Sequence, residues 1–443
     1  MIKPKLSLLD ITMAVVSLII GMGIFIAPSS VAKETGTPTL FFSAWILGGI
    51  FAIFGGLTFA EIGSRLPRAG GYYKVISEVY HPSLAFMLNW MNLLVSCASS
   101  AIVAIIGCKY LSPFIQLEFI HTPAGLKVFA STVILVLFVV NYLGIKTGAG
   151  VLNLLTIVKI VLILAFSIAA IFISSQYTTI QPPTTIPNNH FLPALLFGLV
   201  AVSFTYGGYQ VAMNFGADIK NPKKNLPTGI IIGVLIVVTL YLLINIGYFK
   251  VLGMAHIAAS DLLARDMAEV ILGKTAGNII SIVIFISVLG FLNVTIMQNP
   301  RIYYALAEDG LLPKTFKKIN EKTQVQETGL IFNIALVLFF IMLQGTFDNI
   351  LNYIMFNDTI VMSLIASSVF ILRAKSKEKF DGFKSPLYPV LPAIYIIYLL
   401  SISVSAAIRM NNMNQVIISI GLIVVGYPLY LLLKKAVGLK KST

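Results

Sequence analysis

The chain has 443 residues, of which 58% are hydrophobic and 11% are charged, and its mean hydropathy is +0.92. A soluble domain has roughly 45–50% apolar and about 25% charged residues, so a soluble globule of this composition would expose much of its apolar surface to water. The same values exclude intrinsic disorder, collagen and a coiled coil. The remaining class is an all-α membrane protein that crosses the bilayer many times.

Twelve apolar segments follow one another along the chain, and about 20 residues are enough for each to cross the hydrocarbon core. The first follows a short basic N-terminus, as in a signal peptide, but glycines interrupt it and apolar segments continue to the end. We therefore interpret it as a membrane helix. The predicted spans are 8–34, 38–64, 82–112, 126–145, 149–174, 192–217, 227–252, 276–306, 328–345, 348–373, 388–408 and 413–433.

The loops between these spans carry charge asymmetrically, within a net charge of +14. When the N-terminus is placed in the cytoplasm, 23 of the 31 lysines and arginines fall on the cytoplasmic side, seven fall outside and Lys159 lies within a helix. Cytoplasmic loops of membrane proteins are rich in these residues. We therefore predict a multi-pass protein of the cell membrane with both termini in the cytoplasm. Its basic loops would face the lipid bilayer, and nucleic acid is not an expected partner.

Two of the predicted spans contain glycines in the middle: Gly21-Met22-Gly23 in the first and Gly207-Gly208 in the sixth. Glycine loosens a helix, although it also serves close helix packing in membranes. These two spans each begin a group of five, a pattern typical of inverted-repeat transporters with a site at the bilayer midplane. We predict a LeuT-like 5+5 inverted repeat with unwound helices 1 and 6. The expected divisions are 1–175 (helices 1–5), 190–375 (helices 6–10) and 386–443 (helices 11–12 and a cytoplasmic tail).

An unwound helix leaves backbone N–H and C=O groups without helical partners, which is costly in a membrane unless something satisfies them. An amino acid zwitterion supplies matching charges. We expect its carboxylate on the N–H groups of Gly21 to Ile24, at the positive end of the outer half-helix. Its ammonium would lie on carbonyl groups near Ile20 and of Phe204 to Gly207. No acidic residue and no spare arginine lies near either break in the sequence, so a neutral substrate is predicted.

Five motifs occur in order along the chain: Gly21-Met22-Gly23-Ile24-Phe25, Leu66-Pro67-Arg68-Ala69-Gly70-Gly71-Tyr72, Phe204-Thr205-Tyr206-Gly207-Gly208-Tyr209, Asp218-Ile219-Lys220-Asn221-Pro222 and Ala307-Glu308-Asp309-Gly310-Leu311-Leu312-Pro313. With these motifs the chain resembles, over nearly its whole length, the amino acid–polyamine–organocation (APC) superfamily, and specifically its L-type amino acid transporter (LAT) family. Met22 is a departure, because the family usually has a small serine there. The bulkier side chain would alter the size of the pocket.

Lys159 lies about ten residues into predicted helix 5, hence about 15 Å deep. A charged residue at that depth is a functional candidate, and the alternative is a lysine that snorkels to water. The resemblance implies that Lys159 occupies the sodium site of sodium-coupled relatives, bridging the break of helix 1 to helix 8. Ser287 is the expected hydroxyl partner there. A buried lysine can also release its proton, so proton coupling stays open.

The resemblance also implies roles for two aromatic residues. Phe204 would be the gate, an apolar lid over the substrate, and Tyr241 would help to hold the substrate carboxylate; ordinary packing is the alternative for both. Asp358, in the tenth span, could be a coupling carboxylate, a gate or a vestibule residue, and it is left outside the predicted site. The predicted substrate-binding residues are Ile20, Gly21, Met22, Gly23, Ile24, Phe204, Tyr206, Gly207 and Tyr241.

The predicted function is sodium-independent transport of neutral L-amino acids by alternating access, through amino acid exchange or, alternatively, proton symport. A non-transporting amino acid sensor and a channel are the other uses of such a fold; a channel lining usually shows polar rings, and none is apparent. An enzyme would need a catalytic constellation within the helices, and none is present. The four histidines are scattered, so neither a metal site nor a cofactor is expected.

The cysteines bear on partner proteins. Animal LAT proteins typically pair with a glycoprotein through a cysteine in the loop after helix 3, and the corresponding residues 113–125 contain no cysteine. Cys97 and Cys108 lie in one apolar segment, about 16 Å apart on a helix, too far for a disulfide. We expect no disulfide-linked accessory subunit, which is typical of the stand-alone prokaryotic members.

Overall fold

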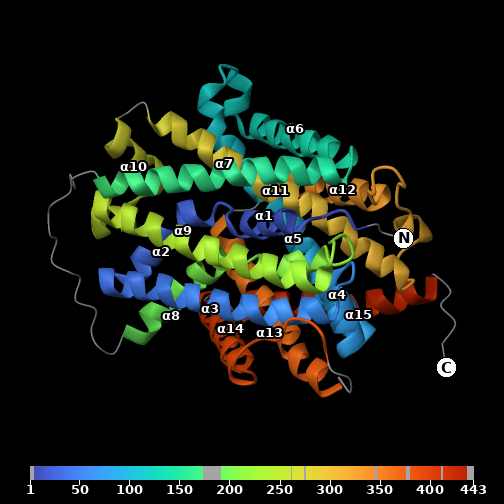
Figure 1. Cartoon of the computed structure of the whole chain (residues 1–443). Helices are drawn as coiled ribbons and strands as arrows, with labels where there is room; N and C mark the ends of the chain where they lie inside the picture. Colours follow the sequence, from blue (N-terminus) through green and yellow to red (C-terminus); the bar gives the residue numbers. More distant parts are fainter. Residues whose placement is uncertain are drawn as a thin grey trace.

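The computed structural model describes residues 4–172, 191–260, 262–273, 276–343, 347–375, 380–410 and 413–436 (Figure 1). Within these residues, four 3₁₀ turns accompany the helices: η1 (Ser112–Phe114), η2 (Glu118–His121), η4 (Tyr209–Asn214) and η5 (Lys314–Lys317). The helices are α1 (Leu8–Ile19), α2 (Gly23–Thr35), α3 (Pro38–Arg65), α4 (Gly71–Val79), α5 (Pro82–Leu111), α6 (Pro123–Tyr142), α7 (Ile145–Phe172), α8 (Phe191–Tyr206), α9 (Pro222–Ala259), α10 (Leu263–Leu272), α11 (Ala276–Glu308), α12 (Glu327–Leu343), α13 (Phe347–Lys375), α14 (Val390–Arg409) and α15 (Met413–Ala436).

Local sequence explains where several helices begin. Ser7 caps α1 and, with Asp10, forms a capping box in which each side chain bonds the other residue's backbone N–H. Thr37, His81 and Thr122 cap α3, α5 and α6 through side-chain acceptors. Each of these three caps is followed by proline, which suits the first helical position because it needs no N–H donor there.

The all-α membrane fold is confirmed, because every predicted span corresponds to a helix. Nine helices within the described residues are long and apolar enough to cross a membrane, and α1 and α2 form a tenth span bent by 40°. The 17-residue α12 and the 24-residue α15 occupy the ninth and twelfth predicted spans. Helices α4 and α10 were not predicted, since each is short and amphipathic. The predicted boundary at 175–190 lies outside the described residues, and the division into two repeats stays a prediction.

The two broken spans lie inside the bundle. α1 packs against α7, α9 and α11, and α2 packs against α8 and α9. α3 runs along α9, while α13 and α14 pack together beside α3 (Figure 1). The breaks are thus enclosed by protein rather than lipid, as unwound backbone at membrane depth requires.

At one end of the bundle the segment before α1 is joined to the chain after η4. The N–H groups of Lys5 and Leu6 donate to the Asp218 carbonyl at 2.8 and 2.9 Å, and Lys220 N–H donates to the Leu6 carbonyl at 2.9 Å. The Asp218 side chain accepts from Arg301 Nε of α11 at 3.1 Å, and both side chains are buried. Since a buried ion is costly unless it is paired, this pair fixes the end of α1 relative to α11.

A second ion cluster joins α3 to α13. The Glu61 carboxylate, fully buried, accepts from Arg65 Nε at 2.8 Å and from Arg373 Nη2 at 2.7 Å. It also accepts the Ser385 N–H at 2.7 Å. Two cations and one amide therefore surround this single carboxylate, which anchors the last turns of both helices.

Close contact between α1 and α9 depends on a glycine. A Cβ added at Gly233 would lie 2.5 Å from Val15 Cγ1 and 3.3 Å from the Thr12 carbonyl oxygen. Val15 is β-branched and stiff at χ1, so it has little freedom to move aside.

We expect Gly233→Ala to push α1 away from α9 and to destabilise the protein by about 1–3 kcal/mol, the usual cost of overpacking. The measurement is the melting temperature of the purified protein in detergent. Gly150→Ala in α7 is the control, because no atom lies within 4 Å of its added Cβ. Equal melting temperatures for the two variants would contradict the packing argument.

Candidate functional site

The first break separates α1 from α2 at Ile20 to Met22. Gly21 N–H turns back to the Ile19 carbonyl at 2.8 Å, and α2 begins at Gly23. Within the described residues, the N–H groups of Met22, Gly23 and Ile24 have no hydrogen-bond acceptor. Three donors therefore point out of the beginning of α2, where the helix dipole favours a negative charge.

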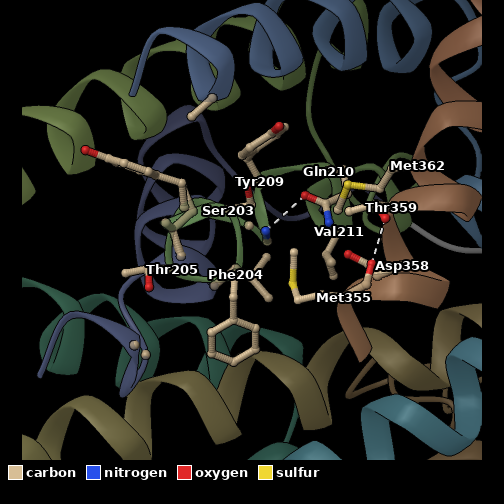
Figure 2. A pocket seen from close by; sticks show the side chains of 18 of the residues that line it. Ser203, Phe204, Thr205, Tyr209, Gln210, Val211, Met355, Asp358, Thr359 and Met362 are labelled. Atoms are coloured by element: carbon tan, nitrogen blue, oxygen red, sulfur yellow. Dashed lines mark hydrogen bonds between the residues drawn. The ribbon is translucent and has the colours of Figure 1, made fainter. Parts of the chain in front are cut away.

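The second break follows α8. Gly208 has φ +119°, a conformation that favours glycine, and its N–H donates to Gln210 Oε1 at 3.0 Å (Figure 2). The carbonyl groups of Thr205, Tyr206 and Gly207 have no hydrogen-bond donor within the described residues. These oxygens complement the free donors of the first break.

The two breaks lie against each other. A Cβ added at Gly208 would lie 2.6 Å from the carbonyl oxygen of Leu18 in α1, and one added at Gly23 would lie 3.1 Å from the Thr205 side chain. Gly23 and Gly208 thus allow close packing of the helices at the same positions where the helices are unwound.

Lys159 of α7 lies behind the first break and is completely buried. Its Nζ donates to the Ile20 carbonyl at 2.5 Å and to Ser17 Oγ at 3.4 Å. The prediction that Ser287 is the hydroxyl partner of Lys159 is wrong, because the Ser287 hydroxyl is buried without a hydrogen-bond partner among the described residues. The part of α11 that faces Lys159 is Gly290, where an added Cβ would lie 3.1 Å from Nζ, so the cation is held by α1 itself.

Tyr241 of α9 also supports the first break. Its hydroxyl donates to the Ile19 carbonyl at 3.0 Å. Its ring packs against Tyr206 and Trp45, with centroids 5.1 and 6.1 Å away. Tyr241 therefore acts on the backbone of the break from behind and does not line the cavity described next.

A cavity of about 200 Å³ lies between the breaks and is large enough for several waters or a small organic molecule. Its walls come from α1, α2, α3, α5, α8, η4, α11, α13 and α14. Of the predicted binding residues, the cavity is lined by Gly21, Met22, Gly23, Phe204, Tyr206 and Gly207, whereas Ile20, Ile24 and Tyr241 are not among its lining residues. The structure thus brings the two predicted breaks to one cavity.

Phe204 is placed at the edge of the second break, and Figure 2 shows its ring extending away from Gln210. Phe291 of α11 lines the same cavity, which places two aromatic rings around it. Met22 is buried, with 4% of its surface exposed, and packs in a cluster with Val288 and Leu292 of α11. Met22, where the chain departs from the family motif, therefore lies in a contact between the first break and α11.

Several polar cavity residues were not predicted. Apart from Ser203 and Gln210, which lie beside the second break, they come from helices that carry no break, so only the tertiary fold brings them to the cavity. Gln298 of α11 belongs to a chain of amides: Asn214 Nδ2 donates to Gln298 Oε1 at 2.6 Å, and Asn299 Nδ2 donates to Asn333 Oδ1 at 2.8 Å. The others are Asn92, Ser96, Ser99, Ser203, Gln210, Thr295 and Thr359.

The expectation that no acidic residue lies near either break is wrong. Asp358 of α13 lines the same cavity as Gly21 and Gly207 (Figure 2). It is about 150 residues from the nearer break in sequence, and the packing of α13 beside α3 and α14 brings it there.

The fold, with two broken helices that meet at one cavity, is that of a membrane transporter. The amino acid permease family matches residues 6–427, and the chain belongs to this family. It is 30% identical to the serine/threonine exchanger SteT of Bacillus subtilis over 98% of both chains. It is 27% identical to the human b(0,+)-type amino acid transporter 1, over 90% of this chain and 82% of that protein. The human large neutral amino acids transporter small subunit 2 is 26% identical over 97% and 80%. The chain is therefore an amino acid transporter that resembles the LAT family, and not an enzyme.

Replacing Tyr241 with phenylalanine should weaken transport several-fold, because one hydrogen bond to the Ile19 carbonyl, worth about 1 kcal/mol, is lost while the ring packing remains. The measurement is the apparent KM for amino acid uptake in proteoliposomes. Tyr248→Phe is a matched control in the same helix, since the Tyr248 hydroxyl is buried with no hydrogen-bond partner among the described residues. Equal effects of the two substitutions would exclude this role.

Proposed function

We propose that the protein exchanges neutral L-amino acids across the cell membrane by alternating access and independently of sodium. The observation that carries the proposal is one cavity lined both by Met22 and Gly23, whose N–H groups are free, and by Thr205, Tyr206 and Gly207, whose carbonyl groups are free. This pattern suits the carboxylate and the ammonium of an amino acid, which carry opposite charges and are attached to the same carbon atom.

The substrate carboxylate would accept from the N–H groups of Met22, Gly23 and Ile24. Hydrogen bonds to a charged group are stronger than neutral ones, so these contacts would supply much of the affinity. The ammonium would donate to the carbonyl groups of Thr205 to Gly207. Because all these groups are backbone, they recognise the part that every α-amino acid shares, and the side chain extends into the remaining cavity.

Lys159 supports independence from sodium. Its ammonium already lies on the Ile20 carbonyl, where a bound cation would otherwise satisfy the break. Unlike a free ion, this ammonium is part of the chain and cannot dissociate. A sodium ion at the same position would meet a like charge in a medium of low dielectric constant. The identity of SteT as an exchanger supports amino acid exchange rather than proton symport.

Phe204 would close over the bound substrate as the gate. Its place beside the second break allows an apolar ring to exclude water without contributing a competing hydrogen bond.

We further propose the inverted repeat of 1–175 and 190–375, cytoplasmic termini and function without a disulfide-linked subunit. Both cysteines are buried in α5, which supports the last point.

Purified protein in liposomes loaded with unlabelled serine should take up labelled serine, and empty liposomes should not. Replacing external sodium by choline should leave the rate unchanged. Equal uptake into empty vesicles driven by an inward proton gradient would favour symport, and stimulation by sodium would refute the role of Lys159.

Lys159→Met should reduce exchange by at least about tenfold, because the Ile20 carbonyl loses its charged donor, a bond worth roughly 1.5–3 kcal/mol. The protein should still elute as a folded species in detergent. Lys146→Met, which removes an exposed lysine from the same helix, should exchange at the normal rate. Normal exchange by Lys159→Met would show that the ammonium is not needed at the break.

A further inference from the structure

We propose that Asp358 forms a side-chain subsite that admits amino acids with a positively charged side chain, alongside neutral ones. This inference rests on the proposed function, because it assumes that the α-carboxylate and α-ammonium of the substrate bind at the two breaks. It concerns what the far side of the cavity recognises, where the backbone groups of the breaks do not reach.

The position of Asp358 is the first argument. It lines the cavity together with the break residues Gly21 and Gly207. In Figure 2 its carboxylate lies on the side of the cavity where Gln210 and Thr359 gather, away from Thr205. A substrate held by the breaks would direct its side chain into this region.

The second argument is that the carboxylate has no counter-charge. Within the described part of the chain, no lysine, arginine or histidine forms an ion pair with the Asp358 carboxylate, and no hydrogen-bond donor contacts it. Lys159, the buried lysine nearest the breaks, is directed at Ile20 and Ser17 instead.

The neighbours of Asp358 do not replace a cation. It interacts electrostatically with the hydroxyl groups of Tyr72, Tyr209 and Tyr395, which are neutral. Thr359 donates its hydroxyl proton to the Met355 carbonyl at 2.7 Å (Figure 2), so this proton is used there and not at the carboxylate.

An unbalanced carboxylate at membrane depth is costly and marks a functional position. The ammonium or guanidinium of a substrate side chain would balance it by a charge-assisted hydrogen bond.

The apolar part of the subsite fits the same class of substrate. Met355, Met362 and Val211 line the cavity near Asp358. Long cationic side chains bury their methylene groups against apolar surface and place the charge at the end. Methionines adapt to irregular shapes, so they suit a flexible stem of this kind.

The test compares labelled L-lysine with L-norleucine, a neutral amino acid with a similar stem, in liposomes loaded with unlabelled norleucine. The wild-type protein should exchange both. Asp358→Asn keeps the shape of the side chain and removes its charge, so lysine exchange should fall by about tenfold or more while norleucine exchange is retained. Glu269→Gln on α10, an acidic residue whose partner is Arg265, is the matched control and should change neither.

Three outcomes would overturn the inference. If the wild type exchanges norleucine but not lysine, the cationic subsite is refuted and the proposed function stands. If Asp358→Asn loses both substrates equally, the carboxylate serves coupling or structure rather than side-chain selection. If the wild type exchanges neither substrate nor serine, the proposed function itself fails.

Discussion

Unwound backbone inside an apolar bundle must find partners, and this constraint organises the centre of the molecule. Two of its exposed carbonyl groups are satisfied from behind, at Ile20 by the Lys159 ammonium and at Ile19 by the Tyr241 hydroxyl. The free backbone groups of Met22 and Gly23 and of Thr205 to Gly207 belong to residues that line the cavity instead. The same requirement supports the proposed binding of a zwitterion, because a ligand with both charges can satisfy both breaks.

Each polar cluster also links helices that are distant in the sequence. The Glu61 carboxylate joins α3 to α13, and the Asp218–Arg301 pair joins the chain before α9 to α11. The amides from Asn214 to Asn333 extend from the second break through α11 to α12. Since apolar contacts give little preference between helices within a lipid environment, such hydrogen bonds and ion pairs fix which helices pack together.

The fold and both breaks could be predicted from sequence, because they depend on local signals: span length, hydropathy and glycines within a span. The depth of Lys159 followed from counting residues along a helix. Its partner did not, because that depends on which face of α11 meets α7, and Gly290 rather than Ser287 lies there. Asp358 was misjudged for a similar reason, since its distance from the breaks is large in sequence and is closed only by the packing of α13.

The anchoring of α13 has a mechanical consequence. Arg373 is held by Glu61 near the end of this helix, and Asp358 lies 15 residues earlier, about 22 Å along the axis at 1.5 Å per residue. A rigid helix held in this way can rotate about Arg373. Rotation by about 5° there would displace Asp358 by roughly 2 Å. A small rearrangement of a charge cluster outside the cavity would in this way change the geometry at the far wall of the cavity.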